Sequence, residues 1–126
     1  MADVAKSKLL HIDTGILDLK NACVVLVKTE WNNDIVDELE RGAIRILEQN
    51  NIKKIISITV PGAVEIPFAI KNYWDTFGKK KKPDAFIALG CVIRGDTPHF
   101  EYVCNAVTEG VTQLIYNYLY PLYLEY

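Results

Sequence analysis

Three short runs of mainly β-branched and apolar residues, separated by segments with helical spacing, most constrain the fold of this chain. The runs span 22–27, 55–60 and 84–89. Short runs of this composition, bounded by turn residues, are typical of strands buried on both faces of a sheet. Because a helical segment separates each strand from the next, the strands are expected to run parallel, with right-handed crossovers. The sequence therefore predicts a doubly wound α/β structure in layers.

The segments between and after these runs carry apolar stripes at helical spacing. The first predicted helix begins at Asn32 or Asn33 and runs to about Gln49, and the second begins near Pro67. A third begins at Pro98. The stripes consist of Ile35, Leu39, Ala43, Ile46 and Leu47, then Ile66, Ala69, Ile70, Tyr73 and Phe77, then Val103, Val107, Val111 and Leu114. Each stripe predicts a helix with one face on the sheet.

An unusual segment follows each predicted strand directly. These segments are 30–32, 61–65 and 90–99, and they contain Trp31, Glu65 and His99. Because the carboxyl ends of parallel strands lie at one edge of a sheet, and ligands bind beyond that edge, we expect the three segments to meet there. They predict a cleft that holds an aromatic ring, a carboxylate and an imidazole.

The third segment has the features of an anion site at the start of a helix. Thr97 is a suitable N-cap, and Pro98 suits the first helical position because it has no N–H to satisfy. Free N–H groups and the positive end of the helix dipole favour an anion there. His99 in the first turn is a candidate for proton transfer. From these residues alone, a structural role for His99, with a satisfied hydrogen bond, stays open.

Composition excludes several classes of function. With 126 residues and a net charge of −2, the chain is expected to form one domain with no electrostatic preference for nucleic acid or membranes. The scattered Cys23, Cys91 and Cys104 show no metal-ligand spacing and no disulfide pattern, so no metal is expected and a reducing cytoplasm is the simplest location. Residues 1–19 are expected to form a flexible arm, without a signal peptide. No Gly-rich nucleotide motif is present.

Two long motifs carry a resemblance to a known family. The segments 60–69 (VPGAVEIPFA) and 90–105 (GCVIRGDTPHFEYVCN) resemble lumazine synthase, which makes the precursor of riboflavin. We expect this resemblance to extend from about Gly15 to Gln113 and to fail after that. It implies a flavodoxin-like, three-layer α/β/α fold and a transferase that condenses 5-amino-6-(ribitylamino)uracil with 3,4-dihydroxy-2-butanone 4-phosphate. It also implies no cofactor, and a homo-oligomer that is a pentamer or a pentamer-based icosahedral capsid.

The resemblance also implies a role for each matching residue. Trp31 would stack on the pyrimidine, and His99 would transfer protons. The alternatives are a Trp31 that covers the core edge and a Glu65 that only stabilises its helix, while Arg94 would bind phosphate or form an ion pair. The remaining implied substrate contacts are Ala63, Val64 and Glu65 for the ring edge and ribityl chain, Cys91, Val92 and Ile93 for the ring pocket, and backbone N–H groups of Asp96 and Thr97 for phosphate.

The stretch 114–126 departs from the family pattern, since it is rich in Tyr and Leu and lacks a helical stripe. From its residues alone, a short terminal strand or a frayed end stays open. The family continues through a fourth strand and two helices that carry a Phe, an Arg and a Lys of the shared active site. We therefore expect a truncated fold that lacks this strand and these helices. With suitable codons, a shifted reading frame over 119–126 can encode a segment that resembles the missing strand, which leads to the hypothesis of a frameshift that the coding DNA would test. A weak or inactive homologue acting as a ligand-binding or assembly scaffold is the alternative to an active enzyme.

Overall fold

The computed structural model describes residues 21–78, 80, 82–118 and 122–125. The predicted strands and helices are all present, and their ends shift by only one or two residues. The flexible arm predicted over 1–19 lies outside the described residues. The elements in chain order are β1 (Cys23–Thr29), α1 (Asn33–Gln49), β2 (Lys54–Val60), the short 3-10 turn η3 (Ala63–Glu65), α2 (Ile66–Phe77), β3 (Ala85–Leu89), α3 (His99–Tyr118) and β4 (Leu122–Glu125).

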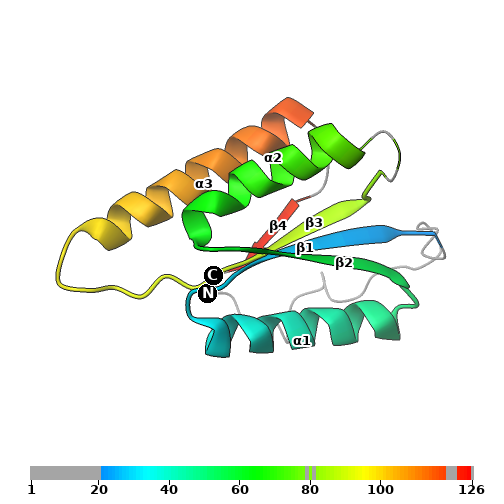
Figure 1. The fold of residues 1–126 in the computed structure, drawn as a ribbon, viewed down its shortest axis with the longest axis horizontal. Coiled ribbons are helices and arrows are strands. Elements are labelled where there is room, and N and C mark those ends of the chain that lie inside the picture. The colour runs from blue at the N-terminus through cyan, green and yellow to red at the C-terminus, as the bar shows by residue number, and fades with distance from the viewer. Residues whose placement is uncertain (1–20, 79, 81, 119–121, 126) are drawn as a thin grey trace, which may run out of the picture.

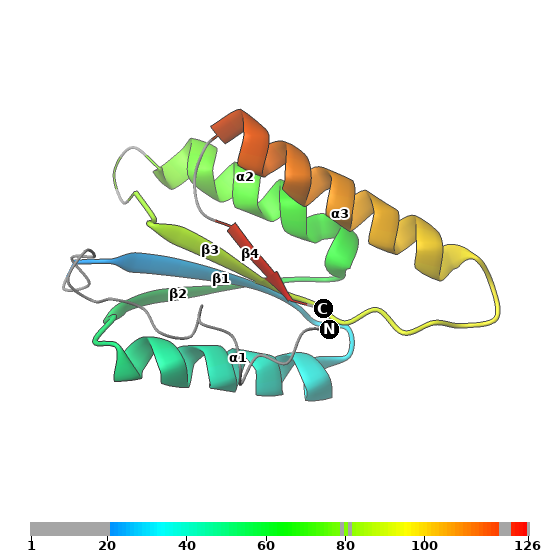
Figure 2. The ribbon, with the colours of Figure 1, turned by 180° about the vertical axis from the view of Figure 1, so that it is seen from behind.

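The strands form one parallel sheet in the order β2-β1-β3-β4. Helix α1 covers one face of this sheet, and α2 and α3 lie side by side on the other (Figures 1 and 2). From β1 the chain passes to β2 on one side, and from β2 it crosses back to β3 on the other side of β1. The strand order therefore reverses between β1 and β3, and flavodoxin-like folds bind ligands at this position. The prediction of a doubly wound, three-layer α/β/α fold is confirmed. None of the described helices is long and apolar enough to cross a membrane.

The expectation that the sheet lacks a fourth strand is wrong. Helix α3 continues to Tyr118, so the first residues of the stretch set apart as a tail are helical. Strand β4 then pairs with β3 in parallel, from Phe86 opposite Leu122 to Leu89 opposite Glu125. Without this pairing, one edge of β3 would leave its N–H and C=O groups unpaired. A strand of four residues is too short to show a clear periodicity, so the sequence left open a short terminal strand or a frayed end, and the structure shows the strand.

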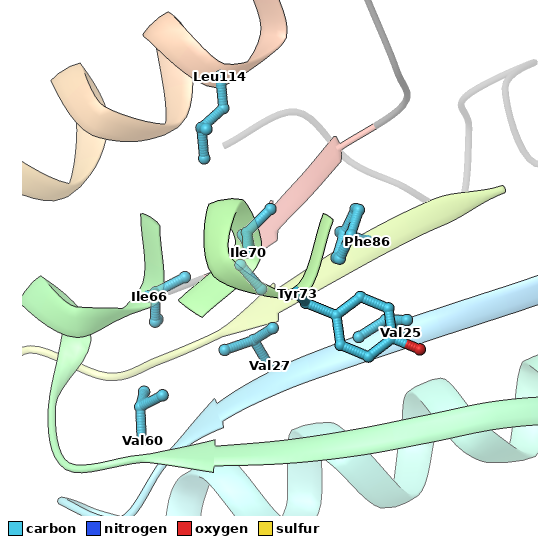
Figure 3. Close-up of a cluster of buried hydrophobic side chains, with 9 residues drawn as sticks. Val25, Val27, Val60, Ile66, Ile70, Tyr73, Phe86 and Leu114 are labelled. Atoms are coloured by element: carbon cyan, nitrogen blue, oxygen red, sulfur yellow. The ribbon is translucent and has the colours of Figure 1, made fainter. Parts of the chain in front are cut away.

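The larger part of the core lies between the sheet and the helix pair α2–α3 (Figure 3). Phe86 of β3 is completely buried, and its ring meets the Tyr73 ring edge-on, with the centroids 6.0 Å apart. This arrangement is favourable for two aromatic rings. The other labelled members of the cluster are Val25 and Val27 of β1, Val60 of β2, Ile66 and Ile70 of α2, and Leu114 of α3. This packing sets the first turn of α2 against the carboxyl ends of the strands.

Helix α1 is held on the opposite face by a smaller apolar cluster and by a polar network. The Lys28 ammonium of β1 donates to Glu40 at 2.9 Å and to Asp37 at 3.1 Å, and the Ser57 hydroxyl of β2 donates to Glu40 at 2.9 Å. The hydrogen bonds to Glu40 and Asp37 raise the pKa of Lys28 above its ordinary value. The network joins β1, α1 and β2, and so fixes where the β1–α1 loop leaves the sheet.

Candidate active site

The loops that follow β1, β2 and β3 all emerge at the carboxyl edge of the sheet, on the left in Figure 1. They enclose a cleft of about 320 Å³. Eight of the residues singled out from the sequence line this cleft: Trp31, Ala63, Val64, Glu65, Cys91, Val92, Ile93 and His99. The predicted meeting of an aromatic ring, a carboxylate and an imidazole in one cleft is therefore what the fold produces.

Trp31 stands on the first loop, with its backbone held and its side chain free. Its N–H donates to the Pro61 carbonyl at 3.2 Å, and its carbonyl accepts the hydroxyl of Thr29 at 3.0 Å. Thr29 is itself buried, whereas the Trp31 side chain is 70% exposed. An indole this exposed does not cover the core. A flat ring on a rigid backbone is instead available to stack on a ligand.

Glu65 closes the short η3 turn on the second loop. One carboxylate oxygen, Oε2, accepts the Gly62 N–H at 2.9 Å, in the manner of a capping box. The helix-stabilising role considered for Glu65 is thus observed. The same bond holds the carboxylate at the wall of the cleft, beside Ala63 and the half-exposed Val64. A carboxylate offers about four acceptor sites, so one bond to Gly62 leaves capacity for a ligand.

The third loop contributes Cys91, Val92 and Ile93 to the cleft, and Figure 1 shows it, in yellow, running outward before α3 begins. Asp96 and Thr97 are exposed and do not line the cleft. The Pro98 carbonyl accepts the N–H groups of Glu101 and Tyr102, at 3.2 and 3.5 Å. The cap is therefore Pro98, and the prediction of Thr97 at this position is wrong by one residue. Proline satisfies either position, because it has no N–H that needs a partner.

His99 is the first residue of α3, and its side chain is both exposed and part of the cleft lining. An exposed imidazole in the cleft lining is accessible both from solvent and from the interior of the cleft. Because His99 begins the helix, its ring lies where the third loop and α3 meet. This position suits a group that transfers a proton to or from a ligand in the cleft.

Arg94 lies on the third loop, where it pairs with a residue of α3 and does not line the cleft. Its guanidinium forms an ion pair with Glu101 and lies over the Phe100 ring, 4.2 Å from the centroid. The hydrogen bond from Arg94 lowers the pKa of Glu101 below its ordinary value. Of the two roles left open for Arg94, the ion pair is the one present in this structure.

Five further residues line the cleft without an individual role predicted from the sequence: Thr29, Asn32, Pro61, Gly62 and Val103. Asn32, Pro61 and Gly62 belong to the segments 30–32 and 61–65, which the sequence predicts at this edge. The side-chain amide of Asn32 donates to the Cys91 carbonyl at 2.9 Å. Nothing local in the sequence indicates this partner, which lies 59 positions away. Pro61 and Gly62 had a recognisable signal, since they end a strand at the ligand-binding edge. The described part of the chain has no group of three or more His, Cys, Asp or Glu that could hold a metal ion.

A parallel α/β sheet with a cleft of this composition at its carboxyl edge is the architecture of a small-molecule-binding, doubly wound protein. The family model for 6,7-dimethyl-8-ribityllumazine synthase matches residues 21–124. The chain belongs to this family. Because the match reaches residue 124, the expectation that the resemblance ends at Gln113 is wrong, and all of β4 except its last residue lies within the matched region.

Curated relatives support the same assignment. The 6,7-dimethyl-8-ribityllumazine synthase of Parabacteroides distasonis is 42% identical over 110 residues, which cover 86% of this chain and 65% of the relative. That of Bdellovibrio bacteriovorus is 46% identical over 99 residues, covering 79% and 52%. That of Phocaeicola vulgatus is 46% identical over 91 residues, covering 71% and 52%. The chain thus spans about half to two thirds of the length of these relatives.

Proposed function

We propose that this chain acts as a 6,7-dimethyl-8-ribityllumazine synthase, which condenses 5-amino-6-(ribitylamino)uracil with 3,4-dihydroxy-2-butanone 4-phosphate in riboflavin biosynthesis. The observation that carries the proposal is the convergence of Trp31, Glu65 and His99, from three different loops, on one cleft. Relatives of the same family that are 42–46% identical bear this enzyme's name. The condensation needs binding, orientation and proton transfer, which side chains of these types supply.

The first substrate, the ribitylaminouracil, would lie between the first and second loops. The exposed indole of Trp31 would stack on the flat pyrimidine. The oxygens of Glu65 that Gly62 leaves free would accept hydroxyl groups of the ribityl chain. Ala63 and Val64 would hold the ring edge, and the strand end at Cys91, Val92 and Ile93 would form the apolar wall of the pocket.

The second substrate would enter from the side of the third loop. Backbone N–H groups near Asp96 and Thr97 would bind its phosphate, since an inward-facing Asp96 carboxylate would repel it. The amine of the first substrate adds to the ketone of the second and water leaves, which forms an imine. Phosphate is then eliminated, and the ribityl-bearing nitrogen adds to the remaining carbonyl with loss of a second water, which closes the second ring. His99 would take and return the protons of these steps.

Replacing His99 with Ala tests the proposal. We expect turnover to fall by about 10²- to 10⁴-fold, the usual contribution of a general acid or base, while the uracil still binds. Asn105→Ala, one and a half turns further along α3 and exposed, is the matched control and should retain activity. Lumazine formation is followed by its absorbance, and uracil binding by calorimetry. An unchanged rate in His99→Ala would remove this residue from the mechanism.

A second candidate is a catalytically weak or inactive homologue that binds ligands or serves as an assembly scaffold. The observation that favours it is the exposed apolar surface of α2 and α3, which an assembly scaffold needs and catalysis does not. In either case we propose a cytoplasmic homo-oligomer, a pentamer or a pentamer-based shell. Large apolar side chains stand exposed on α2 and α3, namely Phe68, Tyr102 and Tyr116. Product formation from the two substrates separates the enzyme from the scaffold.

A further inference from the structure

We propose that Asn32 is a positioning residue of the cleft, whose side-chain amide ties the loop that carries Trp31 to the loop that follows β3. The bond runs from Asn32 Nδ2 to the Cys91 carbonyl oxygen, at 2.9 Å. Both residues line the cleft. The bond itself is independent of what the cleft binds, and only its effect on the uracil substrate rests on the proposed function.

Asn32 lies at a helix N-cap, but its side chain bonds to Cys91 instead of capping the helix. Asn32 occupies the N-cap of α1, where its carbonyl accepts the N–H groups of Ile35 and Val36. An Asn at this position normally caps with its side chain, which stabilises a helix by about 1 kcal/mol. Here the side chain makes no capping hydrogen bond, and φ is 59°, in the left-handed region that Asn adopts more readily than most residues. The amide is directed instead to a distant loop.

The bond completes a set of links that hold Trp31 on both sides. Towards the second loop, the Trp31 N–H donates to the Pro61 carbonyl, and the buried Thr29 hydroxyl donates to the Trp31 carbonyl. Towards the third loop, the next residue, Asn32, reaches Cys91. Cys91 lies two residues beyond the end of β3, so its carbonyl is past the strand pairing of the sheet. The amide therefore joins the indole-bearing loop to the apolar wall formed by 91–93.

This hydrogen bond sets the distance between the loop that carries Trp31 and the apolar wall formed by 91–93. A flat ring would enter the slot between them. The indole of Trp31 is 70% exposed, so few side-chain contacts restrain it, and its position depends on its backbone. A slot that is already in place saves the ligand the cost of ordering it. Loss of the amide donor should therefore weaken binding and raise KM, with a smaller effect on kcat.

The test compares Asn32→Asp with Asn33→Asp. Asp has nearly the same size as Asn and also tolerates the left-handed region, but its carboxylate cannot donate to the Cys91 carbonyl. Asn33 is exposed and does not line the cleft, so Asn33→Asp introduces the same charge one residue away. Both variants also carry Trp74→Phe. Because the chain has 2 Trp residues, Trp31 is then the only tryptophan that remains. The time-resolved fluorescence anisotropy of Trp31 then reports how firmly its loop is held.

We expect Asn32→Asp to increase the fast component of the Trp31 anisotropy decay, and Asn33→Asp to leave it unchanged. The dissociation constant for the ribitylaminouracil should rise by about 3- to 10-fold in Asn32→Asp, the size expected for one hydrogen bond. Asn32→Gly, which keeps the left-handed backbone and lacks the amide, should behave like Asn32→Asp, and circular dichroism checks that each variant folds. Equal Trp31 motion in the Asn32 and Asn33 variants would overturn the proposal. Loosened Trp31 without uracil binding by any form of the chain would instead overturn the proposed function and leave this inference standing.

Discussion

Single side chains around the cleft each pair with a backbone group that the end of a strand leaves without a sheet partner. Glu65 accepts the Gly62 N–H, Thr29 donates to the Trp31 carbonyl, and Asn32 donates to the Cys91 carbonyl. A buried or half-buried backbone group without a partner is costly, so these bonds stabilise the loops. For Glu65, the structural role and the proposed ligand role are therefore compatible, because Oε2 holds the loop while Oε1 remains available to accept a hydrogen bond from a ligand.

Arg94 gives a prediction at the same scale. The hydrogen bond from Arg94 holds the pKa of Glu101 below its ordinary value of about 4.5, so Arg94→Gln should raise that pKa. Because the pKa is lowered, the ion pair is fully present above the ordinary value of about 4.5 and is lost as the pH falls through the lowered pKa. A carbon-13 NMR titration of the Glu101 carboxyl group measures the shift.

The same variant also tests the other role considered for Arg94. Because Arg94 does not line the cleft, Arg94→Gln should leave KM for the phosphorylated substrate within about twofold. Glu101→Gln, which removes the partner and keeps Arg94, is the control. A rise in KM of about tenfold or more in Arg94→Gln alone would identify Arg94 as a phosphate ligand.

At the level of elements, the approach of α3 to the start of α2 depends on a glycine. A Cβ atom added at Gly110 of α3 would lie 2.7 Å from Cγ and 2.9 Å from Cβ of Pro67, in the first turn of α2. The proline ring is rigid and cannot turn aside. Pro67 follows the η3 turn that presents Glu65 by two residues, and α3 also contacts η3, so this approach helps to position the turn.

We predict that Gly110→Ala destabilises the fold, although alanine favours a helix. The gain in helix propensity is about 1 kcal/mol, while overpacking costs about 1–3 kcal/mol, so a net loss of up to about 2 kcal/mol is expected. Gly42→Ala in α1 is the matched control. Nothing lies within 4 Å of a Cβ at that position, so it should stabilise the fold by about 0.5–1 kcal/mol. Urea unfolding measures both, and equal stabilisation by the two changes would contradict the proposed contact.

For the molecule as a whole, the helix pair α2–α3 leaves large apolar side chains uncovered. Phe68 and Tyr102 are each 72% exposed, and Tyr116 is 75% exposed. Scattered exposed apolar residues are ordinary, but aromatic residues are enriched at protein interfaces. These side chains support the proposal that copies of the chain associate.

We predict that the chain sediments as a species larger than its 14.3 kDa monomer, and that Phe68→Glu shifts it towards the monomer. A charge at a buried aromatic contact would be left without a partner, which disfavours association. Gln49→Glu, exposed on α1 on the opposite face of the sheet, adds the same charge away from Phe68 and should have little effect. Analytical ultracentrifugation measures both variants. Association that Phe68→Glu leaves intact would place the interface on another surface.

The sequence by itself determined the repeating order of strands and helices, their parallel arrangement and the edge at which Trp31, Glu65 and His99 meet. Apolar runs and stripes report burial directly, and the rule that carboxyl ends of parallel strands share an edge brings distant loops together without further information. These features need only local patterns and chain topology.

The tertiary structure decided which partner each residue takes. Strand β4 forms because the edge of β3 offers it backbone partners, although four residues carry almost no pattern of their own. The amide of Asn32 bonds to Cys91 instead of to its own helix, and Arg94 pairs with Glu101 outside the cleft. For β4 and Asn32 the partner lies far away in the chain, and for Arg94 the turn from the third loop into α3 brings the partner close, so local patterns alone do not specify these pairs.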